Sequence, residues 1–401
     1  MSSKKENLHY MLDYRSALSL IVASARPLPS EKVTLQQAHN RVLAADVFYD
    51  IDMPPFDKSA MDGYACRMSD LQNELEIVET VYAGKQPEKT IGENQCSKIM
   101  TGAVVPEGAD CVIKKEDALV VGQSKVRCVN PAVAGNICYQ GEDIRNGDKI
   151  LTHPLRITSK HLPVLAGAGI VNVEVYCRPE VMIFATGTEL VEPSVKPKPY
   201  QIRNSNSSQL LGQLSEMNIM ANYGGIVQDE ERVLSEKISE AVNAGQVVIL
   251  TGGVSVGDFD LIPEILKNSG FEILVTATAI KPGKPMVFAR KGEKYCFGLS
   301  GNPVSSFVQF ELYVKPFLFA LMGLPDQPAR LQFRMGSELL RKNADRLNFV
   351  PVVLTREMEV VPVKFHGSAH INALSEASHL LEFPVGTNHL SKGEVVNVRP
   401  I

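Results

Sequence analysis

The stretch QVVILTGG, Gln246–Gly253, holds four consecutive large apolar residues between a polar residue and a Thr-Gly-Gly turn. A strand with apolar side chains at consecutive positions has no polar face, which is typical of a sheet that is buried on both sides. Parallel sheets are buried in this way because the helices that connect their strands cover both faces. The stretch therefore predicts a central strand of a parallel sheet.

The segments on either side of this stretch alternate between strand patterns and helix patterns. A further apolar strand, EVMIFATG, is expected at 180–187. Helices are expected at 208–217, 231–245, 260–270 and 303–323. In the last of them Pro303 occupies a first-turn position, where a proline needs no hydrogen-bonded N–H. The alternation predicts an α/β domain over 178–327, with a parallel sheet and helices on both of its faces.

The remaining sequence predicts three further units, so the expected fold class is α/β plus β in a multidomain chain. Residues 49–149 contain short β-prone runs separated by Gly, Pro and Asn, which predict an inserted β-rich domain. Segments 1–48 and 150–177 together form an expected helical or extended linker domain, with an N-terminal helix and a second short helix after a capping box at Thr34. Residues 328–401 return to β-prone runs, as a small C-terminal β domain.

The composition limits the classes of partner. The 401 residues include 41 basic and 45 acidic ones and carry a formal net charge of −4, which argues against a nucleic-acid-binding protein held by phosphate contacts. The seven cysteines include no Cys-x-x-Cys pair, which favours free, buried thiols in a reducing cytoplasm over a metal or disulfide framework. There is no signal-peptide core and no apolar run of about 18 residues. We expect a cytoplasmic protein that binds neither nucleic acid nor membrane.

Small residues with free donors follow several of the expected strands. In open α/β sheets, ligands bind beyond the carboxyl ends of the strands, where backbone N–H groups are available to anions. The residues at these points are Thr186, Gly187, Thr251, Gly252, Gly253, Ser255, Ser300, Gly301 and Ser305. Ordinary turn chemistry accounts for one such loop, but three loops at one sheet edge favour an anion site. Neither GxxxxGK[ST] nor GxGxxG occurs, so the site differs from that of a P-loop ATPase or a dinucleotide dehydrogenase.

Charged residues accompany these loops. In IKPGKP, Lys281 and Lys284 flank a Pro-Gly turn, from which they can reach an oxyanion or phosphate; solvated surface lysines are the alternative. The carboxylates near expected loops are Glu189, Asp229, Asp258 and Asp260. Carboxylates beside a phosphate site favour a bridging magnesium ion, whereas helix capping is the alternative for Asp229 and Asp260.

The segment Met53–Ala65, MPPFDKSAMDGYA, has neither a helical nor a strand period. Pro54 and Pro55 exclude a helix and disfavour a central strand. The segment predicts a stiff, polar loop that carries carboxylates. Such a loop is expected to contribute residues to a functional site.

Seven motifs occur in order: FDKSAMDGYA, IMTGAVVPEGAD, GEDIRNGD, TGTEL, TGGVSVGDFD, KPGKP and SGNPVSS. This order resembles the molybdenum-insertase family, the molybdopterin molybdenumtransferases, to which the C-terminal domain of gephyrin also belongs. The resemblance implies four domains, with a β-rich domain inserted into a helical one, and an elongated homodimer whose active site is shared between subunits. It also implies a transferase that takes adenylylated molybdopterin and molybdate, uses Mg²⁺, and releases molybdenum cofactor and AMP.

Matched motif by motif, the resemblance assigns roles to individual residues. The catalytic residues that it implies are Asp62, Thr101, Asp143, Lys281 and Asp260. The implied magnesium ligands are Glu189, Asp229 and Asp260. The expected substrate-binding set combines motif matches with the loops described above: Thr186, Gly187, Asp229, Gly252, Gly253, Ser255, Lys284, Ser300, Gly301, Asn302, Pro303, Arg346 and Ser368.

Two positions depart from the family pattern. Many members have Pro where this chain has Ser300, and some have Lys where it has Ala277. If the usual proline only stiffens its turn, Ser300→Pro should be tolerated and slightly stabilising.

Two other functions remain open from the sequence. The α/β domain alone fits a molybdopterin adenylyltransferase, which makes the pterin adenylate, and the whole fold fits a scaffold that binds a partner. The Met53–Ala65 loop and the C-terminal β domain favour the insertase, since a single-domain adenylyltransferase needs neither. The retained acidic residues favour an enzyme over a scaffold. Molybdate and tungstate have the same shape and charge, so either oxyanion fits.

Overall fold

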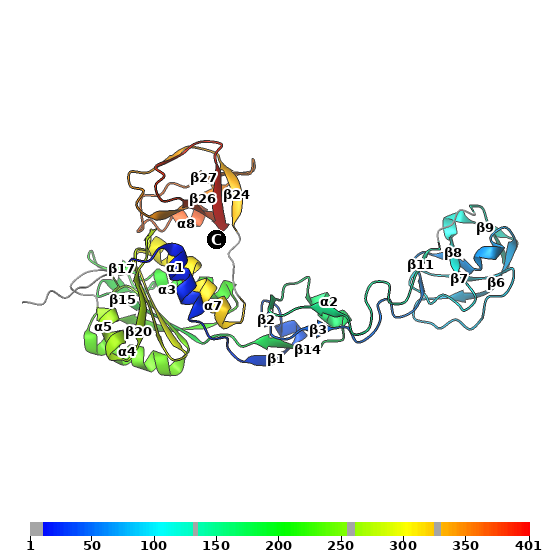
Figure 1. Ribbon diagram of the computed structural model, residues 1–401, viewed down its shortest axis with the longest axis horizontal. Helices are drawn as coiled ribbons and strands as arrows, with labels where there is room; N and C mark the ends of the chain where they lie inside the picture. Colours follow the sequence, from blue (N-terminus) through cyan, green and yellow to red (C-terminus); the bar gives the residue numbers. More distant parts are fainter. Residues whose placement is uncertain (1–10, 131–134, 255–260, 325–329) are drawn as a thin grey trace, which may run out of the picture.

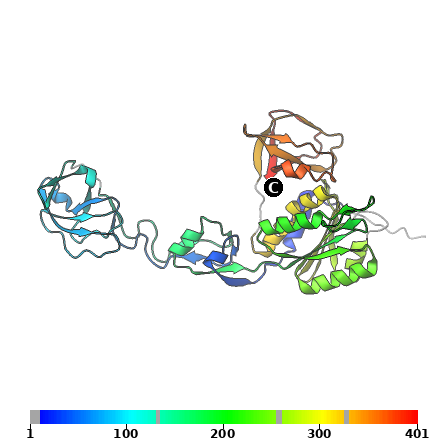
Figure 2. The ribbon, with the colours of Figure 1, turned by 180° about the vertical axis from the view of Figure 1, so that it is seen from behind.

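The computed structural model describes residues 11–130, 135–254, 261–324 and 330–401. The molecule is elongated, as Figure 1 shows. A sheet-and-helix unit and the C-terminal strands lie at one end, and a small β-rich unit lies at the other. A narrow sheet joins the two ends, and the view from behind shows the same arrangement (Figure 2). The chain therefore passes through the narrow sheet twice, once before and once after it forms the β-rich unit.

The sheet-and-helix unit is built on six strands in the order β18-β15-β19-β23-β22-β20. Their bounds are β15 (Val181–Thr186), β18 (Ala221–Val227), β19 (Val247–Thr251), β20 (Glu272–Ala277), β22 (Pro285–Lys291) and β23 (Lys294–Leu299). β18, β15, β19 and β23 run parallel. The QVVILTGG stretch forms β19, which is central and has all of its residues buried, so the prediction of a buried parallel strand is confirmed.

One strand of this sheet runs against the others. β22 pairs with β23 in antiparallel register out to Lys291 and Lys294, which leaves a two-residue turn that begins with Gly292 at a φ of 60°. Such a turn requires a left-handed first residue, which glycine adopts without strain. The sheet is therefore mixed at this edge, where strand-helix alternation predicted parallel strands alone.

Helices cover both faces of the sheet, as predicted. One face carries α1 (Tyr14–Ala23), α3 (Asn206–Glu216) and a composite helix, and the other carries α4 (Glu231–Ala244) and α5 (Leu261–Asn268). The composite helix consists of α6 (Pro303–Gln309), the π-helical segment η4 (Phe310–Val314) and α7 (Lys315–Leu321). In the described residues, this helix is long and apolar enough to cross a membrane, but 83% of its 18-residue apolar window is buried inside the protein, as in a core helix.

The narrow sheet has the order β1-β14-β2-β13. Its strands are β1 (Ser30–Thr34), β2 (Val42–Leu43), β13 (Leu155–Arg156) and β14 (Asn172–Tyr176), with α2 (Leu162–Gly167) beside them. The helix expected after Thr34 is only the 3₁₀ turn η1 (Leu35–Gln37), because Asn40 follows with a φ of 61° and no apolar stripe continues the helix. The N-terminal helix α1 packs into the core of the sheet-and-helix unit through Tyr14, Ala17 and Ile21.

Two short antiparallel pairs carry the chain to and from the β-rich unit. They are β3 (Val47–Phe48) with β12 (Lys149–Leu151), and β4 (Lys58–Ser59) with β11 (Ile137–Cys138). The unit itself has six strands in the order β8-β5-β7-β6-β10-β9. These are β5 (Gly63–Cys66), β6 (Glu74–Val81), β7 (Gln95–Ile99), β8 (Cys111–Lys114), β9 (Ala118–Val121) and β10 (Lys125–Cys128).

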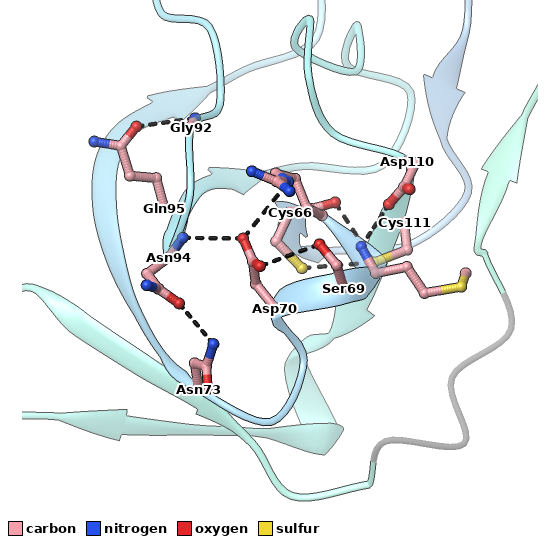
Figure 3. Close-up of polar contacts among 11 residues, drawn as sticks. Cys66, Ser69, Asp70, Asn73, Gly92, Asn94, Gln95, Asp110 and Cys111 are labelled. Atoms are coloured by element: carbon pink, nitrogen blue, oxygen red, sulfur yellow. Dashed lines mark hydrogen bonds and ion pairs between the residues drawn. The ribbon is translucent and has the colours of Figure 1, made fainter.

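Buried polar contacts and thiols stabilise this small unit (Figure 3). The Asp70 carboxylate is buried and accepts hydrogen bonds from the Asn94 N–H at 2.9 Å and the Ser69 hydroxyl at 3.1 Å. The Cys66 and Cys111 sulfurs lie 3.5 Å apart across paired strands and form no disulfide. All seven cysteines are free and most are buried, which confirms the prediction of buried thiols.

The C-terminal strands close into a ring. They are β24 (Leu331–Met335), β26 (Leu347–Leu354), β27 (Glu359–Pro362), β28 (His379–Phe383) and β30 (Val395–Pro400). β26 pairs with β27 and β28, β30 pairs with β24 and β28, and β24 pairs with β27, so the predicted C-terminal β unit is a small barrel. Phe349 and Leu380 of the barrel belong to the same buried cluster as α1 and the composite helix. The barrel is therefore packed onto the sheet-and-helix unit.

Candidate active site

A cavity of about 710 Å³ lies at the carboxyl ends of β15, β19 and β23. This is the edge at which open α/β sheets bind ligands. Most of the expected substrate-binding and metal-ligating residues line it: Thr186, Gly187, Glu189, Asp229, Gly252, Gly253, Ser300, Gly301, Asn302 and Pro303. The three loops that the sequence placed after separate strands thus enclose one cavity.

The loop after β19 passes very close to the end of β15. Gly252 has a φ of 95°, and a Cβ on it would lie 2.3 Å from the carbonyl oxygen of Thr186, so only glycine fits. The Thr186 hydroxyl is buried and lies close enough to the Asp229 carboxylate to lower the pKa of Asp229, but it makes no hydrogen bond of full geometry with a described residue. A buried polar group without a partner costs about 1–3 kcal/mol. A ligand in the cavity would supply that partner.

The first turn of α3 contributes residues that sequence reasoning missed. The Asn206 amide is buried and donates to the Gly301 carbonyl at 2.8 Å and to the Thr251 hydroxyl at 3.3 Å, which joins the ends of two strands. Arg203, Asn204 and Ser205 also line the cavity. The available signal was the polar run RNSNSS directly before an apolar helix pattern, which is a typical helix start.

Two carboxylates of the cavity lie close enough to influence each other. Partial burial raises the pKa of Asp229 and the charge of Glu189 acts in the same direction, whereas the Thr186 hydroxyl and the Thr188 N–H act against this shift. α4 begins at Glu231 with Glu230 as its N-cap, so Asp229 precedes the capping position, and capping does not explain it. Mg²⁺ is commonly held by one or two carboxylates together with substrate phosphates, and this pair fits such an ion. No group of three metal-ligating side chains occurs within the described ranges, and Asp260 and Ser255 lie outside them.

The loop that carries the two lysines reaches the cavity at one end and pairs with the C-terminal barrel at the other. Lys281 and Lys284 are exposed and do not line it, whereas Pro285 of the same loop does. Lys281 ends β21 (Ile280–Lys281), which pairs in parallel with β26 of the barrel, and the Arg346 guanidinium donates to the Ile280 carbonyl at 3.2 Å. The structure therefore brings Lys281 and Arg346 into one neighbourhood.

A second barrel segment covers the start of α6. The Ser368 carbonyl accepts a hydrogen bond from the Val304 N–H at 3.0 Å. Ala369 and Ile371, which follow Ser368, line the cavity. The barrel thus provides a wall of the cavity.

The remaining expected residues lie far from this cavity in the same chain. The Asp62 carboxylate accepts hydrogen bonds from the backbone N–H and the hydroxyl of Thr101, both at 2.8 Å, and these bonds lower the pKa of Asp62. Asp143 is exposed on the return path from the β-rich unit. β7, which leads to Thr101, lies at the end of the molecule opposite β15 (Figure 1). Within one chain, the structure joins Asp62 to Thr101 but not to the cavity.

Comparisons with known proteins cover almost the whole chain. Family models match at residues 12–169 (MoeA N-terminal region, domain I and II), 182–320 (probable molybdopterin binding domain) and 337–401 (MoeA C-terminal region, domain IV). A molybdopterin molybdenumtransferase of Staphylococcus epidermidis is 34% identical and is matched over 96% of this chain and 95% of its own length. One from Staphylococcus aureus is 32% identical over 96% of this chain and 94% of its own. A solved molybdopterin biosynthesis MoeA protein of Pyrococcus horikoshii is 29% identical, with a TM-score of 0.84 over 98% of this chain and 100% of that chain.

Proposed function

The chain belongs to the molybdopterin molybdenumtransferase family and inserts molybdenum into molybdopterin; we propose that its substrate is the adenylylated pterin, held in the 710 Å³ cavity. The observation that carries this proposal is a buried donor with no hydrogen bond of full geometry, the Thr186 hydroxyl, which lies beside Asp229 and two glycine-rich turns. Backbone N–H groups and hydroxyls without a charge of their own suit a phosphate diester or anhydride. The cavity is also large enough for a ligand of nucleotide size.

Magnesium dependence is part of the proposal. Glu189 and Asp229 would hold the ion, with Asp260 as the third ligand that the sequence motif predicts. The raised pKa of Asp229 supports this, because two carboxylates that repel each other gain from a cation between them. Bound there, Mg²⁺ would polarise the phosphoric anhydride that links AMP to the pterin.

We propose that molybdate approaches from the rim. Molybdate is a dianion, and the pterin dithiolene that replaces its oxygens is also negative. Lys281 and Arg346, joined through the β21–β26 pairing, would reduce that repulsion. Preorganised donors of this kind contribute roughly 10²–10³ in rate each.

A homodimer would complete the site. Asp62 and Thr101 form an exposed hydrogen-bonded pair next to β7, and β7 lies at the end of the molecule opposite β15 and the cavity (Figure 1). An isologous dimer exchanges such surfaces between subunits, so one chain's pair can face its partner's cavity. We also propose a cytoplasmic location, because free thiols are typical of a reducing compartment.

The test is molybdate-dependent release of AMP from adenylylated molybdopterin by the purified chain, with and without Mg²⁺. We expect AMP release that requires both molybdate and Mg²⁺. Activity with ATP and bare molybdopterin instead would indicate the adenylyltransferase, and neither activity would indicate a scaffold.

The cavity itself is tested with Thr186→Val, which removes the buried hydroxyl and keeps the shape of the side chain. We expect wild-type thermal stability and weaker AMP binding by calorimetry. Ser306→Ala is the matched control, because its hydroxyl is also buried and without a described partner but does not line the cavity. Equal AMP affinity in both variants would contradict the assignment of the cavity.

A further inference from the structure

Gln309 is fully buried at the end of α6, and its amide connects two loops that border the cavity. The side-chain oxygen accepts a hydrogen bond from the Ser300 N–H at 2.8 Å. The side-chain nitrogen donates to the Gly283 carbonyl at 2.8 Å and to the Pro285 carbonyl at 2.6 Å. Ser300 and Pro285 both line the cavity, while Gln309 does not.

The segment Lys281–Pro285, here the lysine loop, is held from both sides. Gly283 has a φ of 103°, and a Cβ on it would lie 3.0 Å from the Gln309 Cγ, so the loop backbone rests directly on the glutamine. On the other side the Thr278 N–H donates to the Lys284 carbonyl at 2.9 Å, and its hydroxyl to the Gly283 carbonyl at 3.2 Å. Every one of these bonds goes to backbone, so together they fix the course of the loop and leave its two lysine side chains free.

The helix is irregular immediately after this residue. The π-helical segment η4 begins at Phe310. Such segments insert an extra residue into a turn, so the side chains after the segment point in other directions than a regular helix would give them. They are frequent at functional sites. Here α6 presents Gln309 to the two loops, and η4 and α7 present Phe310, Tyr313 and Phe317 to the core.

We propose that Gln309 is a positioning residue for molybdenum insertion: it holds the lysine loop and the Ser300 turn at a fixed separation, so that Lys281 faces the oxyanion beside the cavity. This inference rests on the proposed function of the cavity and of Lys281. An amide is required, because the position needs one acceptor and two donors. A carboxylate would place its charge against two carbonyl oxygens, and an apolar side chain would leave the Ser300 N–H unpaired in the core.

Hydrogen exchange of the full chain tests the geometry without any ligand. Gln309→Met should speed amide exchange about tenfold in peptides that cover 278–286 and 298–304, because their anchoring hydrogen bonds are lost. Gln213→Met is the matched control: Gln213 is also a buried glutamine, but it donates to the Glu311 carboxylate at 2.9 Å and to neither loop. Unchanged exchange in Gln309→Met, or equal acceleration in both variants, would overturn the proposal.

A double-mutant cycle tests the connection to the reaction. Gln309→Met should raise the KM for molybdate in the AMP-release assay about tenfold, with a smaller change in AMP affinity. In the Lys281→Ala background the same substitution should have little further effect, since residues that act as a unit are non-additive. Additive effects on KM would mean that Gln309 acts on stability alone and would overturn its positioning role. No AMP release by the wild-type chain would contradict the proposed function, and hydrogen exchange would then decide the loop geometry by itself.

Gln309→Glu adds a signature that general destabilisation does not produce. Burial raises the pKa of a carboxyl group, and the protonated acid can accept from Ser300 and donate to one carbonyl. The KM for molybdate of this variant should therefore approach the wild-type value as the pH falls from 8 to 6. A KM that differs from wild type by the same factor at both pH values would contradict the hydrogen-bonding role.

Discussion

Asp229 and Asp62 are both expected site carboxylates, but their surroundings shift their pKa values in opposite directions. Partial burial and the neighbouring Glu189 raise the pKa of Asp229, whereas hydrogen bonds from Thr101 lower that of Asp62. A carboxyl with a raised folded-state pKa contributes stability below its unfolded pKa and loses it as the pH rises through the folded pKa. A carboxyl with a lowered pKa contributes stability above its unfolded pKa and loses it as the pH falls.

Asp229→Asn should therefore raise the melting temperature at neutral pH, and the gain should disappear in acid. Asp62→Asn should lower the melting temperature slightly at neutral pH, and this loss should also disappear in acid. Thermal unfolding of both variants across the pH range, without divalent cations, measures the two differences. The same sign for both variants at neutral pH would contradict the opposite environments of the two groups.

Ser300 shows how a contact changes the expectation for a substitution. Its N–H donates to the buried Gln309 oxygen, so Ser300→Pro removes a hydrogen bond and leaves a buried acceptor unpaired. We expect a loss of about 1–3 kcal/mol in the free energy of unfolding, where the sequence pattern predicted a small gain. Ser300→Ala keeps the N–H and should cost less. Urea unfolding compares the two variants, and a Pro variant as stable as the wild type would show that the glutamine finds another donor.

At the level of strands and helices, the close approach of β15 and β19 depends on one glycine. Gly252→Ala would place a Cβ 2.3 Å from the Thr186 carbonyl at a φ of 95°, which strains the turn by about 1–3 kcal/mol. It should also separate the two strand ends and weaken AMP binding.

Gly212→Ala is the control for this substitution. Gly212 lies inside α3 with nothing within 4 Å of a built Cβ, so alanine there should stabilise the chain by about 0.5–1 kcal/mol. Chemical denaturation of the two variants gives both values. A neutral Gly252→Ala would contradict the close approach of the strand ends.

Helices and strands were predictable where the pattern of apolar and capping residues lies within a single segment of the chain. The strand Val247–Thr251, the helices α3, α4 and α5, and the start of the composite helix at Pro303 follow from apolar spacing and capping residues alone. The antiparallel β22 and the position of α1 did not follow. A two-residue hairpin turn sets the antiparallel direction of β22. The position of α1 depends on burial of Tyr14, Ala17 and Ile21 against a sheet that is distant in the sequence.

The elongated shape of the molecule leads to a prediction about the assembled protein. Asp62 directly precedes β5 of the β-rich unit, and Lys281 belongs to the segment between β20 and β22 of the sheet-and-helix unit. These units lie at opposite ends of the molecule (Figure 1), so a shared site requires a second copy. Asp62→Ala and Lys281→Ala, each of which should retain little activity alone, should complement when they are unfolded together and refolded as a mixture. In a mixed dimer one site collects both defects and the other is intact. Random assortment makes about half of the dimers mixed, so roughly a quarter of wild-type activity should return.

The control is each variant refolded by itself, which should keep only its low residual activity. Mass spectrometry of the intact assembly checks that mixed dimers have formed. If mixed dimers are present and no activity returns, both halves of the site come from one chain.

The sequence by itself determined which residues have the chemistry of the site. Its motifs name the turns Thr186–Gly187, Gly252–Gly253 and Ser300–Pro303, and the rule that ligands bind beyond strand ends places them at one edge. Only the tertiary structure decided which residues join those turns. Asn206 and Gln309 make their hydrogen bonds largely to backbone carbonyls and N–H groups of segments far away in the chain. Every residue offers the same backbone groups, so no sequence pattern marks such partners, and folding alone brings them within reach.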